Sequence, residues 1–403
     1  MATIAANSSR SALKRPAPVD PAQRPRQCAR RAAEFAVIGD GGPMKITEVV
    51  LRPDRNNFTL VRLMLASSVI YSHAYEIVSG NSGVDGVSRW IGATVSTYGV
   101  DGFFFLSGFL VYPSLVRLEN VWRFLGARLS RLWPALAFSV LLVVAGGAVI
   151  TTAHGIDYLK GPTLRFILGN LTFAKAFYDL TGVDCGGAAC NVNGSLWTLP
   201  WEMRCYLVLV GLGVAKLASP KWMMRIAYPA TLAFVIAWDT PFRDLVVQHL
   251  RPGLIHLIDV FDRLWPLFCL GTAAYVLRAR IRLSWFIFAG LLALDLATAR
   301  TPVFPQVRAL FIGYAVLALG LLTAEKKPLF RQIPDYSYGM YIYAFPIMMA
   351  LHLGLPSLTY GPLAILTGLA TLPVAAFSWH LVEKPALDGY KGLLKAHATL
   401  QRA

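Results

Sequence analysis

The sequence predicts an all-α, polytopic membrane protein with about ten transmembrane helices and no separate soluble domain. Of its 403 residues, 56% are hydrophobic and only 15% are charged. The mean hydropathy is +0.52. A water-soluble chain of this length carries much more charge. Apolar segments also recur along the chain, most of them close to the roughly 20 residues that a helix needs to cross the hydrocarbon layer.

Ten apolar segments account for the predicted spans. The fifth and the sixth are the shortest, and they fit a full crossing least well. In chain order the segments are Phe58–Val78, Ile91–Leu115, Leu132–Thr152, Leu196–Lys216, Ile226–Trp238, Leu264–Leu277, Leu283–Thr298, Val307–Ala324, Tyr336–Leu355 and Leu363–Leu381.

The basic residues give an orientation. The formal net charge is +16, and Lys and Arg gather in every second connection, for example in Arg117–Arg131 and Lys216–Arg225. Positive charge in alternate connections marks the cytoplasmic side. The pattern therefore predicts an even number of spans with both termini in the cytoplasm. It also favours anionic lipid headgroups over nucleic acid as the partner of the basic charge.

Composition divides the chain into three parts. Residues 1–55 are rich in Ala, Pro, Arg and Ser and contain no long apolar run, so they are predicted to form a disordered, basic cytoplasmic tail. Residues 56–386 form the transmembrane domain, and residues 387–403 form a short cytoplasmic tail. Cys185 and Cys190 fall in a connection predicted to lie outside, where a disulfide and two free thiols both remain open. No metal-ligand cluster is evident.

Ionisable side chains inside spans are costly, and they are candidates for a functional role. Arg62 and His73 are eleven positions apart, about three helical turns or 16 Å, and therefore share one face of the first helix. Asp101 and Glu202 enter later spans from the outside, at a depth predicted to match that of His73. A neutral imidazole held by a carboxylate suits proton removal from a hydroxyl. The alternatives are a packing histidine and an arginine that reaches for the headgroups.

Arg128 and Arg131 lead into the third span from the cytoplasmic side. Because they are three positions apart, they share a helix face, where two guanidinium groups could bind phosphate. Basic residues are also expected at an inner membrane edge, so a purely topological role is the alternative.

The order and spacing of several motifs resemble the acyltransferase-3 family of integral-membrane acyltransferases, which O-acetylate bacterial polysaccharides. These motifs are the pair Arg62 and His73, "GVDGFFFLSGF", the pair Arg128 and Arg131, "NGSLWTLPWE", "SYGMYIYAFP" and "VEKP". The resemblance covers about Phe58 to Lys384. One position departs from it, since Ala344 stands where the family commonly has a histidine.

The resemblance implies transfer of an acyl group, most simply acetyl, from cytoplasmic acyl-CoA to a hydroxyl of a surface or exported saccharide or a lipid-linked saccharide. It implies a bacterial inner-membrane protein that uses acyl-CoA as a co-substrate and has no permanently bound cofactor. A homo-oligomer is compatible with it. The expected site residues are the catalytic His73, Glu202 and Asp101, the donor-binding Arg62, Arg128 and Arg131, and the acceptor-side Ser195, Trp197, Tyr341 and Tyr343.

Two alternatives remain at this stage. The acceptor could be a lipid, a peptide or a small molecule, since the motifs do not name it. A ten-helix secondary transporter or flippase would also carry buried charge, but the inverted repeats typical of transporters are not evident in the sequence.

Overall fold

The structure, a computed structural model, describes residues 44–46, 51, 55–118, 120–184, 191–326 and 334–400. Contacts divide the chain into two units, Met1–Met44 and Lys45–Ala403, and the helices described below belong to the second unit. Most of the predicted N-terminal tail lies outside the described residues, as do Cys185 and Cys190.

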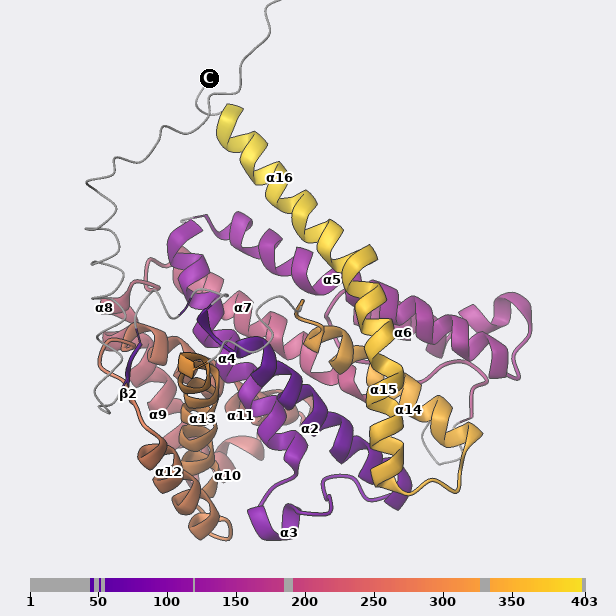
Figure 1. The fold of residues 1–403 in the computed structure, drawn as a ribbon, viewed down its shortest axis with the longest axis horizontal. Coiled ribbons are helices and arrows are strands. Elements are labelled where there is room, and N and C mark those ends of the chain that lie inside the picture. The colour runs from indigo at the N-terminus through magenta and orange to yellow at the C-terminus, as the bar shows by residue number, and fades with distance from the viewer. Residues whose placement is uncertain are drawn as a thin grey trace, which may run out of the picture. The chain divides into compact units, whose positions relative to one another are not determined.

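The described residues are mostly helical, in agreement with the predicted fold class (Figure 1). The α-helices are α2 (Phe58–Ser79), α3 (Ser88–Ile91), α4 (Val95–Leu118), α5 (Val121–Ile150), α6 (Pro162–Leu171), α7 (Thr198–Val214), α8 (Pro220–Trp222), α9 (Tyr228–Trp238), α10 (Phe242–Val247), α11 (Pro252–Val276), α12 (Trp285–Thr298), α13 (Phe304–Lys326), α14 (Ser337–Gly354), α15 (Tyr360–Ser378) and α16 (Lys384–Leu400). The remaining elements are the 3₁₀ helices η2 (Gly155–Leu159) and η3 (Gly194–Trp197), the π-helical turns η4 (Met223–Ala227) and η5 (Trp379–Glu383), and the strands β1 (Met44–Lys45) and β2 (Arg282–Leu283).

Each predicted span coincides with a helix, but several helices begin earlier than expected. Helix α11 starts at Pro252 rather than near Leu264. Its first turns carry Asp259, which accepts hydrogen bonds from Trp238 and Arg243. The apolar pattern is interrupted at Asp259, so the sequence predicted a later start. The helix itself includes Asp259, because its charge is paired.

The count of ten spans is not confirmed. Within the described residues, four helical stretches are long and apolar enough to cross a membrane, and they are Val95–Arg117, Val121–Ile150, Phe304–Ala324 and Tyr360–Ala396. Helices α9 and α12 have 11 and 14 residues, fewer than the roughly 20 that a perpendicular crossing requires.

Helix α4 is central to the packing, because α2, α11 and α13 all pack against it. Two glycines let the backbones of α4 and α11 approach closely. A Cβ atom at Gly108 would overlap the backbone of Phe268, and one at Gly271 would overlap the backbone of Phe105. Small residues have this function in membrane helix pairs, and Gly108 and Gly271 serve it here.

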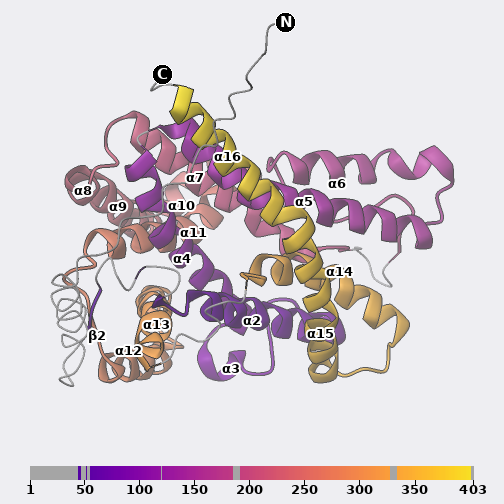
Figure 2. The same cartoon turned by 45° about the horizontal axis from the view of Figure 1, so that its top comes forward.

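The C-terminal helices are joined without a loop. Helix α15 continues through the π-helical turn η5 into α16, which lies along α5 (Figure 2). The Tyr390 hydroxyl donates a hydrogen bond of 2.9 Å to the carbonyl oxygen of Arg123. The C-terminal segment is thereby attached to the helix that carries Arg128 and Arg131.

Candidate active site

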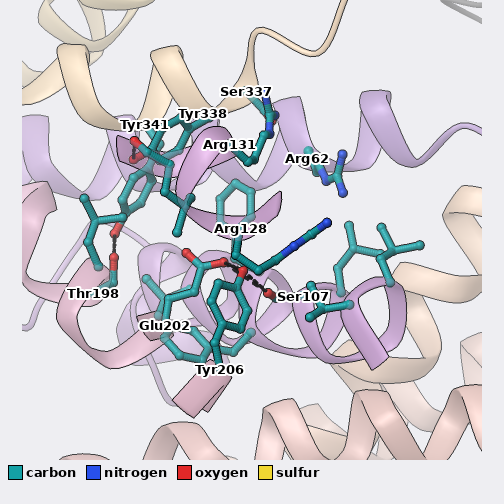
Figure 3. A pocket seen from close by; sticks show the side chains of 18 residues that line it. Arg62, Ser107, Arg128, Arg131, Thr198, Glu202, Tyr206, Ser337, Tyr338 and Tyr341 are labelled. Atoms are coloured by element: carbon teal, nitrogen blue, oxygen red, sulfur yellow. Dashed lines mark hydrogen bonds between the residues drawn. The ribbon is translucent and has the colours of Figure 1, made fainter. Parts of the chain in front are cut away.

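Five helices enclose a cavity of about 150 Å³ (Figure 3). Helices α2, α4, α5, α7 and α14 each contribute residues to its wall. Three arginines and one carboxylate give it charge, and hydroxyl groups and aromatic rings form much of the remainder. The lining residues are Arg62, Val100, Phe103, Phe104, Leu106, Ser107, Leu110, Val111, Arg128, Arg131, Leu132, Thr198, Leu199, Glu202, Tyr206, Ser337, Tyr338 and Tyr341.

Two of the three arginines are neutralised by the same carboxylate. Asp335, just before α14, lies 2.5 Å from Arg62 Nη1 and 3.1 Å from Arg131 Nη2. Ser337 also donates a hydrogen bond to it. Burial raises the pKa of the Asp335 carboxyl, but the two guanidinium groups and Ser337 outweigh this effect and hold that pKa below its usual value.

Arg131 has a second acidic partner on the C-terminal side. Its Nη1 lies 3.1 Å from Glu383 Oε2, in the π-helical turn η5. Glu383 is 1% exposed and also accepts a hydrogen bond from Ser378. Ser378 in turn hydrogen-bonds Tyr343 at 2.7 Å. The predicted acceptor-side Tyr343 therefore belongs to this supporting network and does not line the cavity.

Arg128 differs from the other two arginines. Among the described residues, no carboxylate lies within ion-pairing distance of its guanidinium, and its buried Nε has no hydrogen-bond partner. The Phe124 ring lies 6.0 Å from the guanidinium carbon. Arg128 is half-buried, and a buried guanidinium nitrogen without a partner is costly. Arg128 is therefore the arginine of this cavity best placed to receive an anion.

Glu202 faces the same cavity from α7. Its Oε1 accepts hydrogen bonds from Ser107 Oγ at 3.0 Å and from the Tyr206 hydroxyl. Ser107 and Tyr206 are also 3.0 Å apart, so the three groups form a closed triangle. The two donors fix the orientation of the carboxylate (Figure 3).

Thr198 and Tyr341 meet at another part of the wall, where their hydroxyl groups are 2.8 Å apart. The Phe103 ring meets the Tyr341 ring edge to face, with centroids 5.7 Å apart. Of the four predicted acceptor-side residues, Tyr341 is the one that lines the cavity.

His73 does not line the cavity, although Arg62 on the same helix does. Its side chain is 16% exposed, and its Nδ1 lies 3.4 Å from Glu76 Oε2. Its ring packs edge to face on Phe345, with centroids 5.0 Å apart. Phe345 lies one helical turn along α14 from Tyr341, which lines the cavity. His73 is therefore separated from the cavity by the Phe345 ring and one turn of α14.

The predicted grouping of Asp101 with His73 and Glu202 is wrong in its geometry. Asp101 is 1% exposed and pairs with Arg308 at 3.0 Å and with Arg263 at 3.6 Å. It does not line the cavity. Arg263 on α11 and Arg308 on α13 both form ion pairs with this carboxylate. The position of a residue along its own helix does not reveal partners on other helices.

Ser195 and Trp197 lie in the 3₁₀ helix η3, outside the cavity wall. The Ser195 amide donates to the Asn193 side chain, which begins this helix. The Trp197 ring lies 5.7 Å from the Arg263 guanidinium. Both residues therefore shape the turn that leads into α7 and its Thr198 and Glu202.

Sequence reasoning missed several groups that the structure brings to the site. Asp335 lies next to a connection and had no pattern to single it out, and Glu383 was noted only as part of "VEKP". Tyr206 follows Glu202 by one helical turn, so i, i+4 spacing could have identified it. No group of three or more His, Cys, Asp or Glu side chains suited to a metal ion occurs in the described part of the chain.

The fold and the site define a helical protein with apolar, membrane-type helices around a partly open cavity that is lined by three arginines and one carboxylate. Comparison with known families assigns it more closely. Residues 55–380 match the family described as "Acyltransferase domain", and the chain belongs to this acyltransferase-3 family of membrane proteins. It is accordingly an enzyme that transfers acyl groups.

Three curated relatives are similar over most of their length. The "O-acetyl transferase" of Shigella phage Sf6 is 27% identical, over 82% of this chain and 95% of that protein. "Nodulation protein 10" of Rhizobium leguminosarum bv. viciae is 29% identical, over 83% and 93%. The "Exopolysaccharide production protein ExoZ" of Rhizobium meliloti (strain 1021) is 27% identical, over 73% and 90%. No solved structure gives a significant match.

Proposed function

We propose that this protein moves an acetyl group from acyl-CoA to a hydroxyl of a saccharide in the bacterial inner membrane, with ten spans and both termini in the cytoplasm. The observation that carries the proposal is Arg128, a half-buried cation whose Nε is buried without a hydrogen-bond partner and which has no ion-paired carboxylate among the described residues, in a cavity that also holds a carboxylate. The printed names of two relatives, an O-acetyl transferase and an exopolysaccharide production protein, support the reaction and the acceptor class.

The donor end of the site is the arginine side of the cavity. Coenzyme A carries phosphate groups, and guanidinium groups bind phosphate through paired, charge-assisted hydrogen bonds. Arg62 and Arg131 are already paired with Asp335, so Arg128 supplies the unsatisfied positive charge. Arg62 and Arg131 then form the edge of the donor site.

The reaction itself needs a base and a positioned thioester. The acceptor oxygen attacks the acyl carbon as its proton passes to the base. The carbon–sulfur bond then breaks, the protonated base gives that proton to the leaving sulfur, and coenzyme A leaves as the thiol. Holding the two reactants in line and removing the proton account for most of the required catalysis. The thioester is already activated, so the proposal needs no metal.

His73 is the proposed base. Its ring contacts Phe345, one turn from the cavity residue Tyr341. The side chains of His73 and Phe345 must therefore move to bring the imidazole to the acceptor. Glu202 is the second candidate, because its carboxylate lines the cavity directly.

The proposal is tested with membrane vesicles from cells that produce the protein. The vesicles are incubated with acetyl-CoA labelled in the acetyl group, and the saccharide, lipid and protein fractions are counted separately. We expect base-labile label in the saccharide fraction, and none from vesicles that contain Arg128→Gln. Label found only in the lipid or the protein fraction would contradict the saccharide acceptor.

A further inference from the structure

One side of the cavity is a rigid aromatic wall. Tyr341 and Thr198 are 7% and 6% exposed, and their hydroxyl groups are hydrogen-bonded at 2.8 Å. Phe103 packs against the Tyr341 ring at an interplanar angle of 68°. Figure 3 shows Thr198 and Tyr341 on the side of the cavity away from Arg62. The aromatic wall therefore lies across the cavity from Arg62.

The cavity is small for a ligand site. Its volume is about 150 Å³, half the roughly 300 Å³ at which pockets for drug-sized ligands begin. It accommodates one end of a donor and leaves little room beyond that end.

We propose that Phe103 and Tyr341, with Thr198 holding the tyrosine, form an end wall that restricts the acyl group to a short, uncharged chain. The inference rests on the proposed function, in which the donor's phosphates lie on the arginine side. The acyl end of the donor then enters the cavity from that side, and its acyl group ends against the two rings. Acetyl fits this space, and butyryl and longer chains meet the wall.

The chemistry of the wall also disfavours a succinyl group. Its terminal carboxylate would be placed against two aromatic rings, with Glu202 as the charged side chain that lines the cavity from α7. Because the donor's phosphates occupy the arginine side in the proposed function, this carboxylate would be buried at the wall without a cationic partner, which is costly. The wall thus selects both for length and against negative charge.

The test measures the affinities of the full-length protein in lipid nanodiscs for coenzyme A, acetyl-CoA and butyryl-CoA by calorimetry. We expect the wild-type protein to bind acetyl-CoA more tightly than butyryl-CoA. Phe103→Leu should reduce this preference by about tenfold or more, because one methylene in a close-fitting pocket changes discrimination by roughly 10–200-fold.

Phe105→Leu is the matched control. Phe105 lies on the same helix, is 2% exposed and stacks on Phe109, but it does not line the cavity. It should lose comparable packing and keep the wild-type preference. Thr198→Val provides a second route, because it removes the hydroxyl that holds Tyr341 without removing a ring, and it should also weaken the preference.

The possible results separate this inference from the proposal on which it rests. Equal affinity of the wild-type protein for acetyl-CoA and butyryl-CoA would overturn the end wall alone, and so would equal changes in Phe103→Leu and Phe105→Leu. A folded wild-type protein that binds none of the three ligands would overturn the proposed acyl-CoA donor as well.

Discussion

Replacing Arg128 by Gln should weaken the binding of coenzyme A without lowering the stability of the fold. The change keeps a long polar side chain and removes the charge that has no acidic partner in the described structure. A charge-assisted contact is worth about 1.5–3 kcal/mol, so the affinity for coenzyme A should fall roughly 10- to 100-fold. The free energy of unfolding should change little, because no ion pair is broken.

Arg131→Gln is the matched comparison, three residues along the same helix. It removes the partner of Asp335 and of Glu383, whose side chain is 1% exposed. Breaking a buried pair from one side costs about 3–5 kcal/mol. The lower end, about 3 kcal/mol, applies here because Arg131 itself is 23% exposed.

The assays are thermal unfolding in detergent and titration with coenzyme A. Arg128→Gln should unfold close to the wild-type temperature and bind coenzyme A weakly, whereas Arg131→Gln should unfold earlier. The reasoning is refuted if Arg128→Gln binds coenzyme A with wild-type affinity, or if it is destabilised as much as Arg131→Gln.

Three further predictions follow from the proposed mechanism and topology. His73→Ala should reduce acetyl transfer per folded molecule by about 10²–10⁴-fold, and near-normal turnover of His73→Gln would reassign the base to Glu202. Asp335 has a lowered pKa in the folded state, so its carboxylate stabilises the fold at neutral pH and this contribution disappears as the pH falls below about 4. The unfolding temperature of Asp335→Asn should therefore depend less on pH between pH 7 and pH 3 than that of the wild type. Parallel curves for the two proteins would contradict this. Cysteine placed at Ile156 should react with an impermeant reagent on intact cells and cysteine placed at Ser219 only after permeabilisation, and the reverse pattern would invert the topology.

The helical architecture could be predicted because apolar segments are a property of the sequence itself. The starts of α5 and α11 could not, since charged residues in their first turns, such as Arg123 and Asp259, interrupt the apolar pattern. Asp259 is an example, because its pairing with Trp238 and Arg243 needs three-dimensional proximity. Hydropathy therefore locates a helix more reliably than it locates its ends.

The candidate site was predictable in the same limited sense. Spacing placed Arg128 and Arg131 on one face, and both line the cavity. Spacing could not reveal that Arg131 is paired and Arg128 is not, because Asp335 and Glu383 are distant in sequence. Asp101 shows the opposite error, since the depth predicted for it along its helix could not reveal that it pairs with Arg308 and Arg263 away from the cavity.

The π-helical turn η5 makes the C-terminal region sensitive to its exact length. Deleting one residue between Ser378 and Lys384 would rotate everything that follows by about 100°. Tyr390 would then turn away from its hydrogen-bond acceptor on α5, and Glu383 would turn away from Arg131. Related sequences should therefore tolerate substitutions in this segment far better than single-residue insertions or deletions, and alignment gaps in the family should avoid it.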